Sequence, residues 1–417
     1  MTLLDFQIFM SLSILTLFFE DIARRHAFFI SCIILLLIIP RDLIVLLGFM
    51  FLLMQVYKFF GDKWMWIIAA AILLVEKSGI YVYGDNFKIS GLSFFIITAS
   101  ILLSKQVVTH DLLRLSFFFP HVLAGPVIFE KKDLQSPREN RVISAMLLYA
   151  LGLFLLEIST ILTNRFEILV GDNNVNILFD GWWYLMTLYS NFFGYSLVAL
   201  AYAWLIGFNI SYNFNAPGLA VHPSDFWRRW HMSLSAFMRT YLFPFLRHYS
   251  PVKIAIALTL IISGFWHGLG AGYLIWSILF ALFALVWPRS STISGSKIYR
   301  SASAALFLIS TFPAWLLFGL GNISLSNILS LSISNSILLD ELGLKALAYA
   351  FIATAFYFIP LRILLAPVAR SVLSHGKEVG YLELILRPIS YVAIPIITGI
   401  IISESIGMSA EFIYEQF

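Results

Sequence analysis

Two histidines in this chain stand in settings that could support chemistry. His267 follows Trp266 in the run GFWHG, at the end of an apolar stretch and between Gly264 and Gly268. An ionisable side chain in such a stretch is costly unless it has a partner or a function. Flanking glycines let a second backbone or a substrate chain approach closely, which favours a site. A buried hydrogen-bonding imidazole of the core is the other interpretation, and both stay open at this point.

The second histidine, His231, lies in the run DFWRRWHMSLS over residues 225–235. A helix start signal at residues 223–225 precedes apolar residues at helical spacing, with arginines between them. This pattern predicts an amphipathic helix along a membrane surface, and a plain interfacial anchor would have the same composition. Composition does not account for the histidine. The apolar positions are Phe226, Trp227, Trp230, Leu234, Phe237 and Met238.

The elements around these motifs are those of a polytopic membrane protein. Hydrophobic residues make up 60% of the 417 residues and charged residues 12%, against about 25% charged in soluble domains. The apolar stretches predict an all-α fold with roughly 11–13 transmembrane or re-entrant helices, besides the surface helix. They are residues 3–19, 27–39, 43–60, 64–83, 89–104, 144–162, 182–208, 252–265, 273–287, 302–320, 346–365 and 382–402, with residues 107–122 ambiguous.

We expect one membrane-embedded domain over residues 1–417, in which residues 1–90 supply N-terminal transmembrane helices. The first apolar stretch has no basic residue before it and no small-residue cleavage site after it, which predicts a retained helix. The net charge of +4 could indicate nucleic acid as a partner. We exclude it, because the basic residues form short clusters between apolar stretches, as in cytoplasmic loops. The single cysteine, Cys32, excludes an internal disulfide and a CxxC motif.

Together, the runs DFWRRWHMSLS and GFWHG resemble the membrane-bound O-acyltransferase family. The resemblance is strongest to the bacterial branch that contains alginate O-acetyltransferases and teichoic acid D-alanyltransferases. The chain departs from the usual pattern at Leu197 and Thr240, where many relatives have aspartate, and this puts the identity of the donor in question. Further similar segments follow in the family's order, so that the resemblance covers residues 91–417. They are residues 91–95 (GLSFF), 118–126 (FFPHVLAGP), 193–196 (FGYS) and 412–417 (FIYEQF).

The resemblance implies a helical fold in which a cytoplasmic and an outward-facing cavity nearly meet inside the membrane. It makes His267 the essential residue, which we interpret as the general base that takes a proton from a hydroxyl. His231 is then a second catalytic-site residue that orients or hydrogen-bonds a reacting group. We predict no metal and no tightly bound cofactor, because the acyl thioester donor, acetyl-CoA or an acyl carrier protein, is a substrate.

Seven further side chains are predicted to bind the donor or another substrate. The arginines could hold the phosphates of the donor's phosphopantetheine or, equally, a membrane lipid. Asp225 could be no more than a helix cap. The predicted set is Trp266, Arg228, Arg229, Trp230, Arg239, Asp225 and Ser233.

The resulting hypothesis is a multi-pass O-acyltransferase of the inner (cytoplasmic) membrane. It would pass an acetyl group to a hydroxyl of an extracytoplasmic polysaccharide, or to a relay protein such as an SGNH-type transferase. The alternatives are D-alanyl transfer to a cell-envelope polymer, a transporter whose histidine relays protons, and a non-catalytic scaffold. The sequence has no GxSxG, HExxH, Walker or Rossmann motif, which argues against a serine hydrolase, a zinc hydrolase and an ATP-driven pump.

Overall fold

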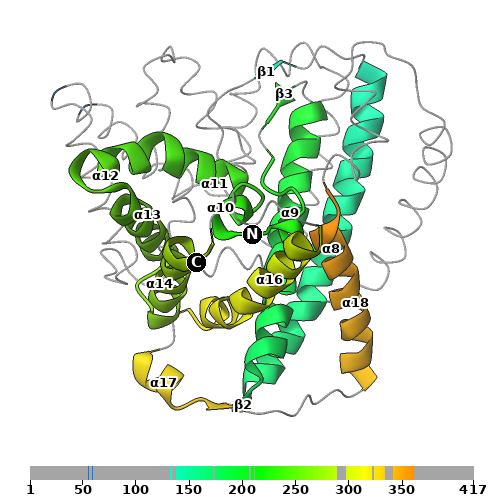
Figure 1. The fold of residues 1–417 in the computed structure, drawn as a ribbon. Coiled ribbons are helices and arrows are strands. Elements are labelled where there is room, and N and C mark those ends of the chain that lie inside the picture. Colours follow the sequence, from blue (N-terminus) through cyan, green and yellow to red (C-terminus); the bar gives the residue numbers. More distant parts are fainter. Residues whose placement is uncertain are drawn as a thin grey trace. The chain divides into compact units, whose positions relative to one another are not determined.

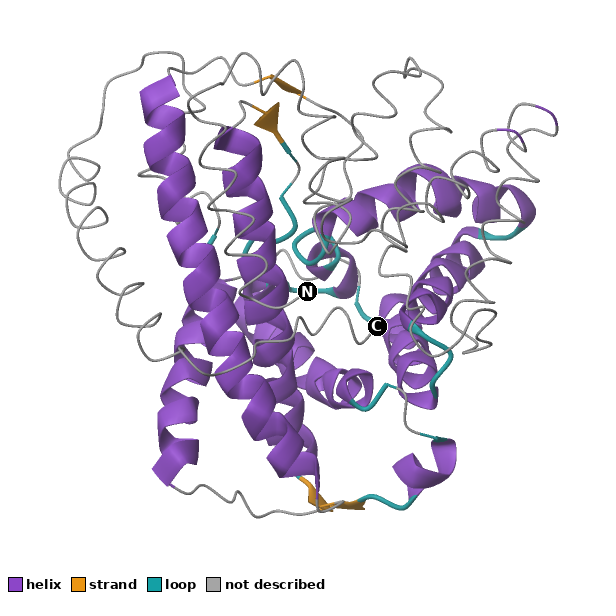
Figure 2. Cartoon of the chain, turned by 180° about the vertical axis from the view of Figure 1, so that it is seen from behind, coloured by secondary structure: helices purple, strands orange, loops and turns teal. Residues whose placement is uncertain are grey.

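The computed structural model describes residues 138–360, with gaps at 172–173, 206–207, 211, 289–296, 322–323 and 334–340, together with residues 132–133 and the helical residues Gln55 and Phe59. This part of the chain is almost entirely helical (Figures 1 and 2). The strands within the described ranges are two pairs of two residues each, and the remaining non-helical residues form turns and loops. The prediction of an all-α fold is therefore confirmed.

Four predicted apolar spans lie wholly within the described residues, and the spans 182–208 and 346–365 lie there in part; each of the six corresponds to a helix. Ser144–Phe166 and Ile298–Gly319 are the described segments long and apolar enough to cross a membrane, and Val252–His267, Ala271–Val286 and Gly343–Phe358 are shorter apolar helices. The predicted spans within residues 3–122 and 382–402 lie outside the described residues, apart from Gln55 and Phe59 of the span 43–60, which are helical. The six helices are α8 (Arg138–Gly171), α9 (Ile177–Leu205), α13 (Val252–His267), α14 (Ala271–Val286), α16 (Lys297–Gly319) and α18 (Glu341–Phe358).

The chain divides into two compact units. The described part of the first unit contains the beginning of α8, the end of α9, and the antiparallel strands β1 (Lys132–Asp133) and β3 (Phe208–Asn209). The described part of the second unit is residues 154–194 and 213–360. All the predicted catalytic and binding residues belong to this second unit.

In the second unit, α14 packs against both α13 and α16 (Figure 1). Glycines permit the closest approaches between helices. A Cβ at Gly264 of α13 would collide with Ser277 of α14, and one at Gly181 of α9 would collide with the Phe312 carbonyl of α16. Small residues at such contacts are a common way of packing helices in membranes. The backbone that approaches Gly264 is therefore that of a neighbouring helix.

Three short elements also belong to the described part of the second unit. Strands β2 (Asn174–Val175) and β4 (Ser332–Ile333) pair in parallel, and the short helix α17 (Leu325–Leu329) comes just before β4. Ser324 caps α17, because its side chain accepts the Asn327 N–H. Helix α17 and strand β4 lie between α16 and α18 in the chain, whereas β2 lies between α8 and α9.

The predicted surface helix begins where expected, but its predicted continuity is wrong. Helix α10 (Pro223–Phe226) is one turn long, and the chain leaves helical geometry before α11 (Met232–Phe237). A π-helical turn, η3 (Met238–Leu242), and α12 (Phe243–Tyr249) follow. Most of the apolar residues assigned to the membrane face, including Trp230, are buried in the protein. The segment is therefore part of the core, and a turn near His231 is what breaks the helix.

Candidate functional site

His267 is the last residue of α13, and four aromatic rings surround it. The ring centroids of Trp266 and Phe318 lie 4.6 Å and 4.8 Å from that of the imidazole. Those of Trp276 and Tyr273 lie at 5.6 Å and 6.2 Å. The rings come from α13, α14 and α16, and His267 is 9% exposed. Three packed helices therefore fix the position of this imidazole.

His231 contacts the same tryptophan as His267. Its ring centroid is 6.1 Å from that of Trp266, and it meets Phe192 of α9 edge-on at 4.6 Å. His231 lies outside the candidate spans, and its burial lowers its pKa to about 3. The imidazole is therefore neutral at pH 7, and a neutral imidazole can accept a hydrogen bond at one ring nitrogen and donate one at the other. The two histidine motifs, distant in the sequence, meet at one buried indole.

A strained turn places His231. Its φ of 40° and ψ of 54° lie in the left-handed region, which few residues other than glycine adopt. The Asn215 N–H donates to the Arg229 carbonyl, and the Met232 N–H donates to the Asn213 carbonyl, both at 2.9 Å. These bonds use the Arg229 carbonyl and the Met232 N–H, which lie on either side of His231. A continuous helix would need the Met232 N–H for its own hydrogen bond, so α10 ends before α11 begins.

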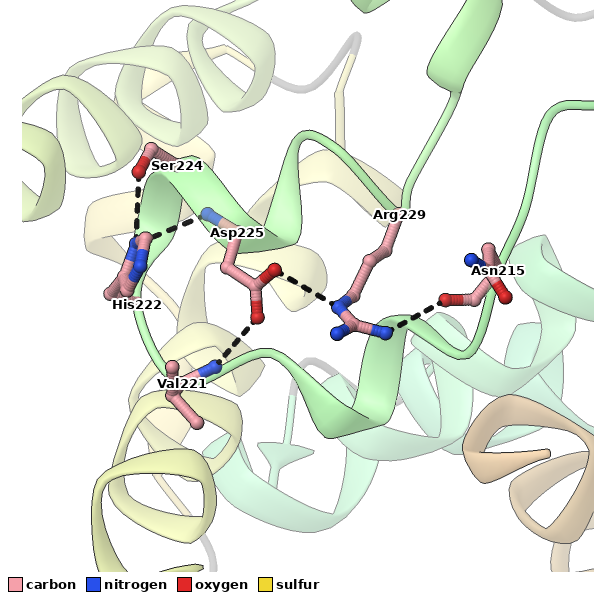
Figure 3. A network of polar contacts seen from close by, with 6 residues as sticks. All are labelled: Asn215, Val221, His222, Ser224, Asp225 and Arg229. Carbon is pink, nitrogen blue, oxygen red and sulfur yellow. Dashed lines mark hydrogen bonds and ion pairs between the residues drawn. The ribbon is translucent and has the colours of Figure 1, made fainter. Parts of the chain in front are cut away.

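Asp225 ties this turn together (Figure 3). Its carboxylate accepts from the Arg229 Nε at 3.1 Å and from the Val221 N–H at 3.4 Å. The Arg229 guanidinium also donates to the Asn215 carbonyl at 3.2 Å. Through Arg229, the Asp225 ion pair therefore joins α10 to Asn215. Residues 213–215 in turn form backbone hydrogen bonds with the residues beside His231.

His222 caps the start of α10, as Figure 3 also shows. Its Nδ1 accepts the Asp225 N–H at 3.1 Å and lies 2.9 Å from the Ser224 hydroxyl. Burial lowers the pKa of His222, the Asp225 carboxylate opposes this, and the Arg228 charge adds to it. Pro223 occupies the first helical position, where the missing N–H costs nothing. The helix start predicted from the sequence is thus real, and its cap is a histidine.

Several predicted binding residues have contacts within the fold. Asp225 and Arg229 bond each other, and the Ser233 hydroxyl donates to Asn213 Oδ1 at 2.5 Å. Trp230 is buried against several aromatic rings, among them that of Trp315 at 4.8 Å. These side chains hold the turn and its core in place. A role in substrate binding stays a prediction for them and for the indole between the two histidines.

Arg228 and Arg239, by contrast, have exposed side chains. Arg228 lies in the turn after α10, and Arg239 lies in the π-helical turn η3. Such turns are rare and often occur at functional sites. Thr240, which stands where the family pattern has aspartate, is exposed in the same turn, whereas Leu197 is buried in α9.

Sequence reasoning missed several residues of the site. Phe192, Trp276 and Phe318 contact the two histidines, yet each lies in an apolar span in which an aromatic residue carries no special signal. Asn213 and Asn215 were also missed. Their closeness to the Pro-Gly pair at residues 217–218, which form the short helix η2 (Pro217–Leu219), is a turn signal that could have found them.

The described side chains of the site are suited to moving a proton. An imidazole can accept a proton near neutral pH, and His267 is held among aromatic rings next to a second imidazole, that of His231, which burial keeps uncharged. In the part of the chain that the structure describes, no three His, Cys, Asp or Glu side chains gather as metal ligands would.

The model of the MBOAT family, membrane-bound O-acyltransferase, matches residues 93–294 of this chain. The match includes both histidine motifs and begins close to residue 91, where the family resemblance was expected to begin. With the apolar helices, it identifies a membrane protein. One domain over residues 1–417 stays a prediction.

Named relatives agree with this match. The chain is 28% identical over 227 residues to a peptidoglycan O-acetyltransferase of Helicobacter pylori, which is 49% of this chain and 43% of the relative. It is 30% identical over 172 residues to a probable alginate O-acetylase of Pseudomonas syringae pv. tomato, covering 38% and 33% of the two chains. It is 28% identical over 206 residues to a teichoic acid D-alanyltransferase of Bacillus subtilis, covering 43% and 52%. The chain thus spans about half or less of each relative.

Proposed function

Because residues 93–294 place this chain in the membrane-bound O-acyltransferase family, we propose that it transfers an acyl group from a thioester to a hydroxyl. The single observation that carries the proposal is the contact of His231 and His267 with one buried ring, that of Trp266. A pair of imidazoles held by packed helices is suited to hydroxyl activation, and the aromatic shell reduces competition from water.

His267 acts as the general base in this proposal. Its neutral imidazole takes the proton of the acceptor hydroxyl as the oxygen attacks the thioester carbonyl. The new C–O bond forms, the C–S bond breaks, and the thiolate leaves with the proton that the imidazolium returns. A positioned base contributes about 10²- to 10⁴-fold to such a step. The donor, the acceptor and the imidazole together account for every bond and proton in this step.

His231 orients a reacting group. Its low pKa keeps it uncharged, so that it can donate one hydrogen bond and accept another without competing for the proton that His267 carries. The left-handed backbone and the bonds to residues 213–215 hold it in one orientation. We assign it a positioning role because its environment disfavours the imidazolium.

Acetyl is the proposed acyl group, with acetyl-CoA or an acyl carrier protein as donor. The names of relatives support acetyl first, since two of the three are an O-acetyltransferase and an O-acetylase. The acceptor is then a hydroxyl of an extracytoplasmic polysaccharide, or a relay protein such as an SGNH-type transferase. We propose that the protein is a multi-pass protein of the inner (cytoplasmic) membrane. D-alanyl transfer is the second candidate, favoured by the teichoic acid D-alanyltransferase match.

The test uses the full chain in lipid nanodiscs. Release of free thiol from acetyl-CoA is followed with and without three acceptors: mannuronate oligomers, soluble peptidoglycan fragments, and water alone. A D-alanyl-loaded carrier protein replaces acetyl-CoA in a parallel series. Acceptor-dependent thiol release supports transfer, and the donor that gives it selects between acetyl and D-alanyl. No turnover of either donor would contradict the proposal.

A histidine substitution locates the base. His267→Ala should lower transfer at least about 100-fold, whereas His248→Ala, at an exposed position near the end of α12, should leave it unchanged. Elution as a folded species and an unchanged melting temperature are required of both variants. A near-normal rate in folded His267→Ala would remove this residue from the mechanism.

A further inference from the structure

A cluster of indole rings lies next to His267. The ring of Trp276, from α14, contacts the imidazole at 5.6 Å between centroids and almost at a right angle, 89°. Trp315 of α16 and Trp227, directly after α10, contact Trp276 in turn, at 5.8 Å and 6.0 Å. Phe280 packs against all three indoles, with centroids 5.2 Å, 5.3 Å and 5.6 Å away. The proposed base therefore borders a continuous aromatic cluster.

The indole N–H groups of this cluster are buried without an acceptor. The Nε1 atoms of Trp276, Trp315 and Trp227 are enclosed, and none of them donates a hydrogen bond to a residue that the structure describes. Trp276 and Trp315 are 2% and 1% exposed. Trp183, which is equally buried, donates its indole N–H to the Leu162 carbonyl at 2.9 Å. Because a buried donor without an acceptor destabilises the fold, three in one cluster need an explanation.

The proposed acyl transfer requires a hydrogen-bond donor at the thioester carbonyl. When the acceptor oxygen attacks the acyl carbon, the carbonyl π electrons move onto the carbonyl oxygen, which stays negatively charged until the C–S bond breaks. The imidazole of His267 holds the hydroxyl proton during this step, so a second group must stabilise the charge. A fixed neutral donor that is shielded from water suits this task. An indole N–H is such a donor, since it donates hydrogen bonds and accepts none.

The separation of Trp276 and His267 fits these two roles. The base lies one hydrogen bond from the hydroxyl, the charged oxygen forms on the adjacent acyl carbon, and the donor lies one hydrogen bond further on. Base and donor are then expected to be about 5–7 Å apart. The two ring centroids are 5.6 Å apart. Trp276 therefore lies at the distance from the base at which an oxyanion donor is needed.

Resting on the proposed function, we propose that Trp276 is a further catalytic residue, whose indole N–H donates a hydrogen bond to the thioester carbonyl oxygen in the transition state. The C=O bond re-forms as the C–S bond breaks, the thiolate leaves with the proton from the His267 imidazolium, and the indole keeps its own proton. The donor's unused hydrogen bond in the free protein is then made during the reaction, where it lowers the barrier.

The helix packing that fixes the base also fixes this donor. The Trp276 ring packs against Phe318 of α16 at 4.9 Å. Its neighbour Ser277 lies against Gly264, where α13 and α14 approach most closely. A donor held in this way needs no reorganisation when the negative charge develops. The ring of Trp315, by contrast, contacts Trp276 but not the imidazole in the part of the chain that the structure describes.

An isosteric replacement tests the donor. The full chain in nanodiscs carries 3-benzothienylalanine in place of Trp276, so that sulfur replaces the N–H while the ring keeps its shape. The kcat for acetyl transfer should fall about 100-fold or more, as expected for the loss of one oxyanion donor. KM should stay within about twofold, because the negative charge exists only in the transition state. An unchanged kcat would overturn the proposal.

The same replacement at Trp315 is the matched control. It removes an equally buried N–H from the same cluster, one ring away from the imidazole, and it should leave kcat within about twofold. Melting temperatures close to that of the wild type are required of both variants. Equal losses of kcat at positions 276 and 315 would mean that the N–H groups serve the cluster's packing or buried water, and would overturn the assignment.

Tyr273→Phe tests a competing donor. Tyr273 lies one turn before Trp276 on α14, and its ring centroid is 6.2 Å from that of His267. The proposal expects transfer to continue in this variant with a smaller loss than at position 276. A loss of kcat about 100-fold in Tyr273→Phe, with full activity in the benzothienylalanine variant, would assign the donor to the phenol and overturn the proposal.

Binding of S-trifluoroacetonyl-CoA reports on the donor without turnover. Its hydrated ketone reproduces the tetrahedral carbon and oxygen of the intermediate, which CoA lacks. Replacing the indole of Trp276 should weaken calorimetric binding of the analogue about 10-fold or more and leave CoA binding unchanged. The indole proton resonance of Trp276 should also move downfield in the analogue complex. A wild type with this binding pattern that acylates no acceptor supports the donor and counts against the proposed function, whereas an active wild type without it overturns the donor alone.

Discussion

The two histidines of the site are held in opposite ways. His267 ends a regular helix, and neighbouring helices fix it through close packing and aromatic contacts. His231 sits in a strained turn between two short helices, held by backbone hydrogen bonds and by the Asp225–Arg229 pair. The first arrangement depends on apolar packing that any membrane helix can provide. The second depends on a few polar groups, so a single substitution can disturb it.

The largest expected effect separates the chemical roles of the two regions. His267→Gln should lower acyl transfer by about 100-fold or more, because glutamine cannot take a proton. His231→Asn should lower it by about 10-fold, since asparagine tolerates the left-handed backbone and keeps a hydrogen-bonding group. Initial rates with acetyl-CoA and a mannuronate acceptor measure both. Equal losses would contradict the division of roles.

The helix-packed region is tested by its glycine. Gly264→Ala should reduce the free energy of unfolding by about 1–3 kcal/mol, because the added methyl group meets Ser277 and the Tyr273 carbonyl. Ser277→Gly in the same chain should recover part of the loss, since it removes one of the colliding groups. Thermal midpoints in detergent report both changes. A Gly264→Ala variant as stable as the wild type would show that α13 and α14 can separate without cost.

The turn region is tested by pH. The pKa of His231 is 6.5 when exposed and about 3 in its buried position, so its contribution to stability is complete above pH 6.5 and is lost as the pH falls toward 3. The stability difference between wild type and His231→Asn should therefore shift by about 1.4 kcal/mol per pH unit below 6.5, to the disadvantage of the wild type. Urea unfolding at pH 7 and pH 5 measures it. A difference that does not vary with pH would mean that the ring is hydrated.

The smallest effect concerns the ion pair of the turn. Asp225→Asn should cost about 1 kcal/mol, because the pair is only partly buried. Acyl transfer should fall by more than the lost fraction of folded protein can explain, since the Asp225–Arg229 pair positions His231. A double-mutant cycle with Arg229→Gln isolates the coupling. Additive losses would show that the two side chains act independently.

Much of the fold could be predicted from hydropathy. The six described spans follow directly from long runs such as residues 252–265 and 302–320, because backbone hydrogen bonds in lipid must be satisfied within each helix. The surface helix from Pro223 was predicted from the same kind of pattern, and there the prediction failed. Helical spacing of Phe226, Trp230 and Leu234 indicates which residues are buried, but it cannot show that other backbone groups will interrupt the helix.

The candidate site was predictable in part. His267 stood out because ionisable groups are rare in apolar stretches, and His231 stood out because an amphipathic anchor does not account for a histidine. The rings of Phe192, Trp276 and Phe318 did not stand out, since aromatic residues are common there. The arginines looked alike in the sequence, and only their bonds separate Arg229 from the other two.

The sequence by itself determined the helical class, the resemblance to a family and the two histidine motifs, because these depend on local composition and on the order of residues. Only the tertiary structure decided that both imidazoles meet Trp266 and that His231 adopts a left-handed backbone. The reason is physical: contacts between α9, α13 and α16, and hydrogen bonds from residues 213–215, join parts of the chain that are far apart in sequence. No local pattern encodes those distances.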